Sequence, residues 1–206
     1  MSVQYKLYNG TNHYEREQGS KIANKLEYLR STSDKRMRDF RRRFVQYKPF
    51  MANWFHILCL GARLGEEVKV FKEIGFSNTV GIDLHPDKHS RYVVQGNWNK
   101  MHWDDNSFNC LYTNSIDHAW PIPLLVKEAR RVLVNQGIFI LELWKKHSLS
   151  DKQIKERFDN DKRYESVLWN NPQDVVGLFK RFTVLKQWDA GKFNVFVLQL
   201  KNPEDS

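Results

Sequence analysis

The fold is decided by one stretch of the sequence, Ile57-Leu58-Cys59-Leu60-Gly61-Ala62-Arg63-Leu64-Gly65-Glu66-Glu67. Its first four residues form a continuous apolar run, which is typical of a strand buried on both faces of a sheet. Two glycines follow, and from Leu64 to Ile74 the apolar side chains recur with a helical period. Gly75 is placed to end that helix. The stretch therefore predicts a buried strand, a tight turn and a helix.

The same alternation continues toward the C-terminus. Apolar runs typical of strands recur at residues 79–84, 92–94, 108–112 and 137–141. A helical period at 123–133 separates the last two runs. Alternating strands and helices predict an open α/β fold with a mostly parallel sheet and right-handed crossovers. Two closing strands are predicted at 182–188 and 193–200, joined by the hairpin signal Asp189-Ala190-Gly191-Lys192.

One link between predicted strands is unusually short. Residues 85–91, with Pro86 among them, separate the second strand from the third. A parallel crossover normally needs a dozen or more residues, usually including a helix. We therefore expect either a bare loop in place of a full helix or a different position for the third strand.

The first fifty residues carry most of the positive charge. They hold 12 of the 33 Lys and Arg residues and 5 of the 24 Asp and Glu residues, a net +7 out of the total +9. Apolar positions from Met37 to Tyr47 recur with a helical period, and the arginines fall largely off this stripe. Ser31-Thr32-Ser33-Asp34 predicts a break before this helix, and Pro49 its end. We divide the chain into a basic helical extension, 1–50, and an α/β domain, 51–206.

Composition excludes several classes of protein. With 41% hydrophobic and 14% aromatic residues, the chain is too apolar to be disordered. Its two cysteines, Cys59 and Cys110, both lie in apolar runs, which excludes a disulfide framework. No apolar run approaches the roughly 20 residues that span a bilayer, and the segment Met1–Gly10 is too polar for a signal peptide. We therefore expect a soluble, cytoplasmic protein without a membrane partner.

Ligands of such sheets bind beyond the carboxyl ends of the strands. The glycine turn after the first strand lets a nucleoside approach backbone amides at a helix N-terminus. The second strand ends in Asp83, which is placed to accept both hydroxyls of a ribose. A dinucleotide is disfavoured, because Arg63 interrupts the glycine pattern and because Glu66 and Glu67 would repel a pyrophosphate but not a cation. The structural alternatives are a tight turn and a capping carboxylate.

With these features the sequence resembles the class I S-adenosylmethionine-dependent methyltransferases, in the methyltransferase type 11-like group. The segments that carry the resemblance are 57–65, 80–84, 96–98, 103–108 and 128–137. The resemblance implies a Rossmann-like, seven-stranded, mostly parallel sheet with an antiparallel last strand, here lacking a full helix between strands two and three. It also implies S-adenosyl-L-methionine as cofactor. The cofactor-binding residues that it implies are Gly61, Ala62, Arg63, Gly65, Asp83, Leu84, Asn97, Trp98 and Asn114.

Two residues depart from the family pattern. Arg63 stands where the family has its central glycine, and two interpretations stay open. Its side chain either grips the carboxylate of the cofactor or an anionic substrate, or it pairs with Glu66 or Glu67. Asn97 lies in the loop where the family often has an Asp that meets the adenine amino group. An Asn side-chain oxygen accepts the same hydrogen bond.

The segment after the fourth strand, Thr113–Pro121, faces the transferable methyl group in the family. Asp117 and His118 are therefore the candidate catalytic residues, His118 as a general base oriented by Asp117. The structural alternative is a hydrogen-bonded pair in a loop or at a helix cap. The scattered histidines and carboxylates of residues 85–105 lack a recurring ligand spacing, so no metal site is expected.

The resemblance implies a methyltransferase that acts on an unidentified acceptor. We expect a small-molecule or nucleotide-like acceptor, with a phosphate-bearing one as a candidate, and RNA as a further candidate partner through the basic helix. One alternative is a non-catalytic protein of the same fold, serving as a binding subunit or scaffold. The other is a nicotinamide dehydrogenase, which the interrupted glycine pattern disfavours. The oligomeric state is not readable from the sequence.

Overall fold

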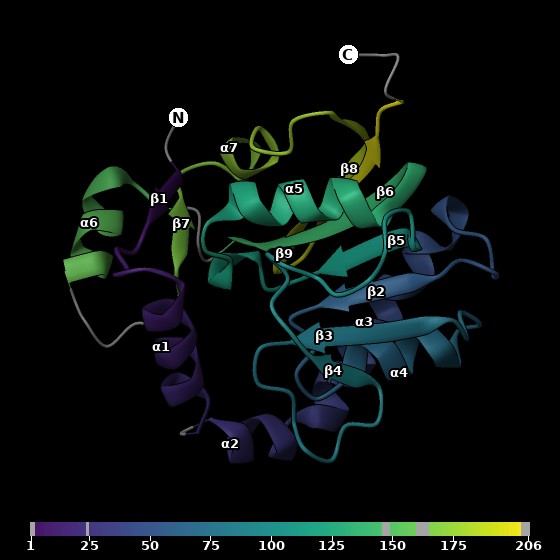
Figure 1. Ribbon diagram of the computed structural model, residues 1–206, viewed down its shortest axis with the longest axis horizontal. Coiled ribbons are helices and arrows are strands. Elements are labelled where there is room, and N and C mark those ends of the chain that lie inside the picture. Colours follow the sequence, from purple (N-terminus) through teal and green to yellow (C-terminus); the bar gives the residue numbers. More distant parts are fainter. Residues whose placement is uncertain (1–2, 24, 146–148, 160–164, 203–206) are drawn as a thin grey trace.

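The computed structural model describes residues 3–23, 25–145, 149–159 and 165–202, and its centre is a seven-stranded sheet in the order β4-β3-β2-β5-β6-β9-β8 (Figure 1). The strands are β2 (Ile57–Leu60), β3 (Thr79–Asp83), β4 (Val93–Gln95), β5 (Phe108–Thr113), β6 (Leu133–Trp144), β8 (Phe182–Ala190) and β9 (Phe193–Leu200). Strands β2 to β6 pair in parallel, and β9 is antiparallel to both β6 and β8. The predicted Rossmann-like class with an antiparallel last strand is confirmed.

Helices and strands begin close to their predicted positions, with two differences. Helix α4 (Glu66–Glu73) starts two residues later than predicted, because Gly65 is its N-cap in the left-handed conformation, with φ of 72°. Strand β6 starts directly after α5 (Ile122–Val132) and is longer than predicted. Its first residue, Leu133, pairs with Phe108, and the register then shifts before the regular ladder begins. The polar residues at this irregularity hid the start of the strand.

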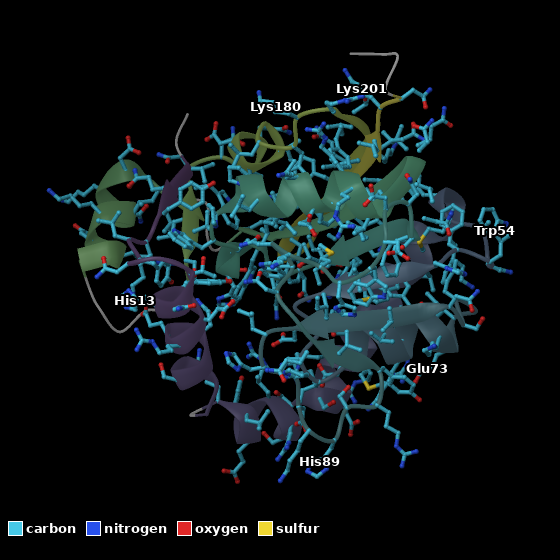
Figure 2. The ribbon with its side chains drawn as sticks, in the orientation of Figure 1. His13, Trp54, Glu73, His89, Lys180 and Lys201 are labelled. Atoms are coloured by element: carbon cyan, nitrogen blue, oxygen red, sulfur yellow. The ribbon has the colours of Figure 1, made fainter. Side chains whose placement is uncertain are left out.

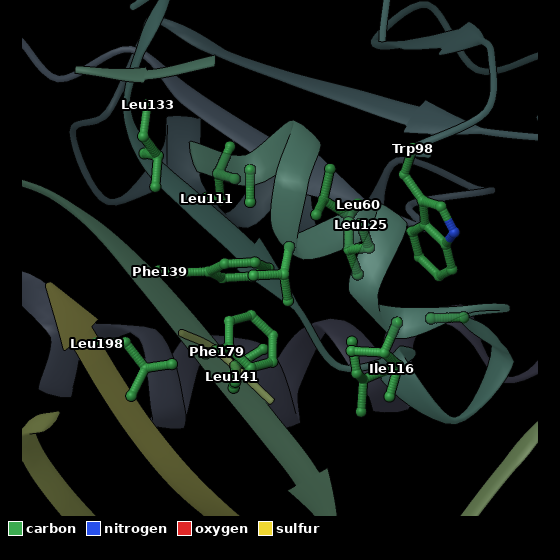
Figure 3. Close-up of a cluster of buried hydrophobic side chains, with 14 of the residues drawn as sticks. Leu60, Trp98, Leu111, Ile116, Leu125, Leu133, Phe139, Leu141, Phe179 and Leu198 are labelled. Carbon is green, nitrogen blue, oxygen red and sulfur yellow. The ribbon is translucent and has the colours of Figure 1, made fainter. Parts of the chain in front are cut away.

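The two faces of the sheet are covered by different helices. Residues alternate along each strand, so Leu58 and Leu111 belong to the cluster under α5, whereas Cys59 and Tyr112 belong to the other. The first cluster includes α5 and residues around α7 (Pro172–Val176) and is drawn in Figure 3. The second packs against α4 and α3 (Ser33–Phe44).

Residues 84–92, all of them described, contain no helix, so the link between β3 and β4 is a bare loop. The predicted third strand was placed correctly, one residue from its observed start. Two helices that precede the sheet pack against this loop. Arg30 in α2 (Leu26–Ser31) binds the Asp87 carboxylate at 2.8 Å, and His85 Nε2 lies 3.2 Å from the carbonyl oxygen of Glu15 in α1 (Thr11–Ala23).

The N-terminal quarter contains the predicted helices and one strand that the sequence did not reveal. Helices α2 and α3 meet at Thr32, inside the predicted break. The expected end at Pro49 is wrong for the α-helix, which stops at Phe44. The Pro49 ring would clash with the carbonyl oxygen of Val45, four residues earlier, in α geometry, and the chain continues as the 3-10 helix η1 (Val45–Phe50). Strand β1 (Val3–Tyr5) pairs antiparallel with β7 (Val167–Trp169), beside α6 (Asp151–Asp159) (Figure 1). The division at residue 50 stays a prediction.

Charged side chains such as Glu73, Lys180 and Lys201 lie at the periphery and point away from the sheet (Figure 2). The N-terminal basic face is partly neutralised by the rest of the chain. Arg41 binds the Glu73 carboxylate at 2.8 Å, and Arg43 binds the buried Glu142 at 2.8 Å. Among the described residues, no helix combines the length and the apolar character needed to cross a bilayer.

Candidate functional site

The carboxyl ends of β2, β3, β4 and β5 border one cavity of about 250 Å³. This is the edge at which open α/β sheets bind their ligands. On the sheet side the cavity is lined by Gly61, Ala62, Arg63, Leu64, Ile82, Asp83, Leu84, Gly96, Trp98, Asn114 and Ser115. Seven of the nine predicted cofactor-binding residues are thus brought together, and the other two, Gly65 and Asn97, lie outside the lining.

The turn after β2 is built around Gly61. Its φ of 74° lies in the left-handed region, where a side chain is strained. A Cβ at this position would also lie 3.0 Å from Cζ3 of Trp98 and 3.1 Å from Cβ of Ser115. The missing side chain therefore keeps the backbone open toward the cavity. Gly65 lies on the other side of the turn and caps α4. A Cβ at Gly65 would point at Ser90 of the neighbouring loop and Val93 of β4.

Asp83 is 7% exposed at the end of β3, and its carboxylate lines the cavity. Oδ2 accepts a hydrogen bond from the backbone N–H of Arg63 at 3.2 Å, and Oδ1 accepts one from the N–H of His85 at 2.8 Å. A carboxylate has about four acceptor positions. Asp83 is therefore fixed by the backbone and retains acceptor capacity for a ligand in the cavity.

The Arg63 side chain lies beside this carboxylate. Its Nε atom is 3.9 Å from Oδ1 of Asp83, and the same Nε is buried without a hydrogen-bond partner among the residues that the structure describes. The predicted alternative of a pair with Glu66 or Glu67 is wrong, because Glu66 binds a different arginine. Arg63 and Asp83 thus place a guanidinium and a carboxylate side by side in one wall of the cavity.

Two acids from the first turn of α4 form the neighbouring wall. Glu66 accepts two hydrogen bonds of 2.7 Å from Arg36 of α3, one from Nε and one from Nη2. Glu67 makes no ion pair within the described part of the chain. Its pKa is raised to about 7, mainly by burial. The adjacent Glu66 also raises the pKa, whereas a hydrogen bond from its own backbone amide and the charge of Arg36 lower it. The cavity therefore contains a carboxyl group that titrates near neutral pH.

The loop after β4 contributes Trp98 to the cavity and Asn97 to its surroundings. Trp98 is 7% exposed, lines the cavity and packs into the cluster under α5 (Figure 3). Asn97 donates a hydrogen bond from Nδ2 to Glu15 Oε1 of α1 at 2.8 Å, and its Oδ1 accepts one from the N–H of Asn99 at 2.8 Å. Asn97 therefore connects the loop to α1.

The segment after β5 carries Asn114 and the predicted catalytic pair. Asn114 and His118 line the cavity, whereas Asp117 does not. His118 Nε2 lies 3.4 Å from Oδ2 of Asp117, within η2 (Ile116–His118). Tyr14 of α1 donates a hydrogen bond from its hydroxyl to the backbone oxygen of His118 at 2.7 Å. The imidazole thus lies beside an acid of its own turn, and the backbone of that turn is bound to α1.

Sequence reasoning missed the side of the cavity that the N-terminal helices supply. Tyr14 and Gln18 of α1, Leu29 of α2, and Arg36 and Phe40 of α3 all line it. The sequence predicted Phe40 as an apolar helix position. For a polar residue such as Gln18, no local sequence pattern indicates that it lines a cavity formed mainly by residues 61–118. Tertiary contacts bring them there, among them the pairing of β1 with β7 and the packing of α1 on η2.

A comparison with family models finds one match in the part of the chain that builds the cavity. Residues 58–141 match the family model described as a methyltransferase domain. This segment is therefore similar to a methyltransferase domain. The matched segment begins in β2 and ends in β6, so it contains the glycine turn, Asp83, Asn114 and His118. A comparison with the curated proteins found no match.

Solved structures share the fold of this chain. A Burkholderia thailandensis 1,6-didemethyltoxoflavin-N1-methyltransferase, solved with 1,6-didemethyltoxoflavin and S-adenosylhomocysteine bound, has a TM-score of 0.70 and 13% identity over 98% of this chain and 94% of its own. The PH0226 protein of Pyrococcus horikoshii has a TM-score of 0.61 and 22% identity over 79% of this chain and 91% of its own. An S-adenosylmethionine-dependent methyltransferase from Mesorhizobium loti has a TM-score of 0.59 and 12% identity over 75% of this chain and 95% of its own.

The residues of the cavity fit S-adenosylmethionine, the cofactor that a methyltransferase domain indicates. Asp83 has free acceptor capacity for ribose hydroxyls, and the buried Nε of Arg63 lacks an acceptor. Gly61 leaves room that a Cβ would fill. The carboxyl group of Glu67, which makes no ion pair within the described part of the chain, suits the positive charge of a sulfonium or an ammonium group.

Proposed function

We propose that the chain binds S-adenosylmethionine in this cavity and transfers its methyl group to a small-molecule acceptor. The observation that carries the proposal is the placement of the Asp83 carboxylate. It is fixed by two backbone N–H groups in the cavity wall, next to a glycine turn whose Cβ-free face is open. A buried carboxylate with unused acceptor positions needs polar partners, and a ribose diol supplies them.

The remaining predicted residues take different parts in this proposal. Gly61, Ala62, Leu84, Trp98 and Asn114 form the walls around the nucleoside and the methionine portion. Arg63 offers its unpartnered Nε to an acceptor on the ligand. Gly65 shapes the turn, and Asn97 positions α1 through Glu15, so both support the cavity without lining it.

When bound, S-adenosylmethionine would supply an electrophilic methyl group to the acceptor's nucleophile. The electron pair of the broken S–C bond would stay on sulfur, which leaves S-adenosylhomocysteine. The protein's task is to align the partners and exclude water. His118, which lines the cavity beside Asp117, accepts the acceptor's proton where the nucleophile carries one. The N-terminal helices close the cavity opposite the strand ends.

The structure favours a small molecule over RNA as the acceptor. Arg36, Arg41 and Arg43, which the sequence placed on a basic helix face, are each engaged by a carboxylate of the same chain. Their charge is therefore less available to phosphates of a nucleic acid. The toxoflavin-related enzyme with the same fold carries a small heterocyclic ligand, in agreement with this assignment.

Isothermal titration calorimetry with S-adenosylhomocysteine tests the proposal. We expect saturable binding, and Asp83→Ala should weaken it by about 1–3 kcal/mol, the scale of hydrogen bonds to a charged acceptor. Asp104→Ala, which removes an exposed acid outside the cavity lining, is the matched control and should bind like wild type. Absence of binding by the wild-type protein would refute the proposal.

Turnover separates an enzyme from a scaffold of the same fold. S-adenosylmethionine incubated with the protein and fractionated small-molecule extracts should yield S-adenosylhomocysteine, and His118→Ala should lower the rate for an acceptor that loses a proton. Cofactor binding without product from any fraction would favour the scaffold alternative. Thermal protection by NAD, with none from S-adenosylmethionine, would revive the dehydrogenase alternative.

A further inference from the structure

A second cavity has a volume of about 580 Å³. It lies between α3 on one side, and the end of β6 and the turn that joins β8 to β9 on the other. Its volume is within the range of about 300–1,000 Å³ that is typical of small-molecule sites. Arg36, Phe40 and Asn114 line both cavities, so the two share a wall at the carboxyl end of β5. Methyl donor and acceptor must approach to about 3–3.5 Å. A cavity adjoining the proposed cofactor site at this wall is therefore placed to hold the acceptor.

The charge of this second cavity is positive. Lys35, Arg42 and Lys192 are exposed in its lining and make no ion pair within the described part of the chain. Asp39 is the acidic residue in the described lining. These three unpaired cations outnumber the one carboxylate of the described lining, and the excess of positive charge favours an anionic ligand.

Aromatic rings form the floor beside these charges. The rings of Trp144 and Phe193 lie 6.5 Å apart at an interplanar angle of 31°, and Trp144 is 39% exposed. The Arg43 guanidinium stacks over Phe193 at 4.7 Å from the ring centre, and its Nε binds the buried Glu142 at 2.8 Å. Phe193 is thus held in place by a neutralised arginine, which gives a rigid surface for a flat ligand.

We propose that the second cavity binds the methyl acceptor, and that the acceptor is a small aromatic molecule with a carboxylate or phosphate group. This inference rests on the proposed function of the neighbouring cavity. The anionic group lies against Lys35, Arg42 and Lys192, and the ring packs on Trp144 and Phe193. The acceptor's nucleophile then reaches the first cavity beside Asn114.

Titration with simple aromatic probes tests this assignment. Benzoate and phenyl phosphate, which distinguish a carboxylate from a phosphate, should each bind at least about tenfold tighter than neutral benzamide, and higher salt should weaken them. Arg42→Gln should weaken the preferred anion about threefold, and Arg42→Gln with Lys192→Gln about tenfold. Arg38→Gln is the matched control, an exposed arginine of α3 outside the lining, and should leave binding unchanged.

The outcomes separate this inference from the proposed function. S-adenosylhomocysteine should bind to the Arg42→Gln, Lys192→Gln double variant as to wild type, because neither residue lines the first cavity. Equal binding of benzamide and benzoate, or no loss in the double variant, would overturn the inference even if S-adenosylhomocysteine binds. Failure of S-adenosylhomocysteine to bind would refute the proposed function, and the probe titrations would then still report on the second cavity. The small-molecule assignment would be overturned if a short RNA bound more than about a hundredfold tighter than phenyl phosphate and the Arg42→Gln variant lost this tighter binding.

Discussion

Glu67→Gln is expected to stabilise the ligand-free protein at pH 8 much more than at pH 5. Glu67 lies in the first turn of α4, in the wall of the proposed cofactor cavity, and burial raises its pKa to about 7 from the ordinary 4.5. In the unfolded chain the same carboxyl group has its ordinary pKa. Between these two values the folded protein holds a proton that the unfolded protein has released. The free energy of unfolding therefore falls as pH rises through this window.

The magnitude follows from the two pKa values. Each pKa unit corresponds to about 1.4 kcal/mol, so full ionisation of Glu67 costs the folded state about 3 kcal/mol, of which most appears between pH 5 and pH 8. Gln is similar in size and does not titrate, so the variant escapes this loss. The difference between variant and wild type should grow by about 2–3 kcal/mol, which is about 5–10 °C in melting temperature for a chain of this length.

Thermal and denaturant unfolding at the two pH values measure this difference. Glu66, Arg36 and Glu142, which act on the Glu67 carboxyl, are present in both proteins, so a comparison at equal pH removes most of their own titration. Glu73→Gln is the control, because this exposed acid lies on the same helix and pairs with Arg41. A Glu67→Gln effect that is the same at pH 5 and pH 8, or equal to that of Glu73→Gln, would refute the reasoning.

Two further substitutions test the site and the core. Gly61→Ala should lower both the free energy of unfolding and the free energy of S-adenosylhomocysteine binding by about 1–3 kcal/mol, because it forces an Ala into φ of 74° and brings Cβ to 3.0 Å from Trp98. Thermal shift and calorimetry measure these two quantities, and unchanged values would contradict the prediction. Arg43→Met should cost about 3–5 kcal/mol in denaturant unfolding, because it leaves the buried Glu142 without its ion pair. Arg41→Met breaks an exposed pair and should cost less than about 1 kcal/mol; equal losses would count against the burial argument.

The parts of the fold that follow from local pattern were predictable. The apolar run of Ile57–Leu60 and the turn signal at Gly191 each depend on neighbouring residues, and both elements formed as predicted. The short strand β1 was missed because three residues, Val3–Tyr5, carry too little pattern, and its partner β7 lies more than 160 residues away. Such a pairing is set by the tertiary fold.

The candidate site was predictable where it lies on strand ends. Asp83 is the last residue of β3 and Asn114 directly follows β5, so the topology alone carries them to the cavity. Asn97 was placed correctly in its loop, but its side chain faces Glu15 on α1, which no sequence spacing reveals. The partner of Glu66 was also mistaken, because the arginine that binds it, Arg36, comes from a helix that packs across α4.

A crystal structure with S-adenosylhomocysteine tests the central claim most directly. The account predicts that both ribose hydroxyls lie within hydrogen-bond distance, about 2.6–3.2 Å, of the Asp83 carboxylate, with the adenine beside Trp98. An adenosyl group bound elsewhere, or an Arg63 side chain that fills the space next to Asp83 while the ribose lies outside, would contradict it.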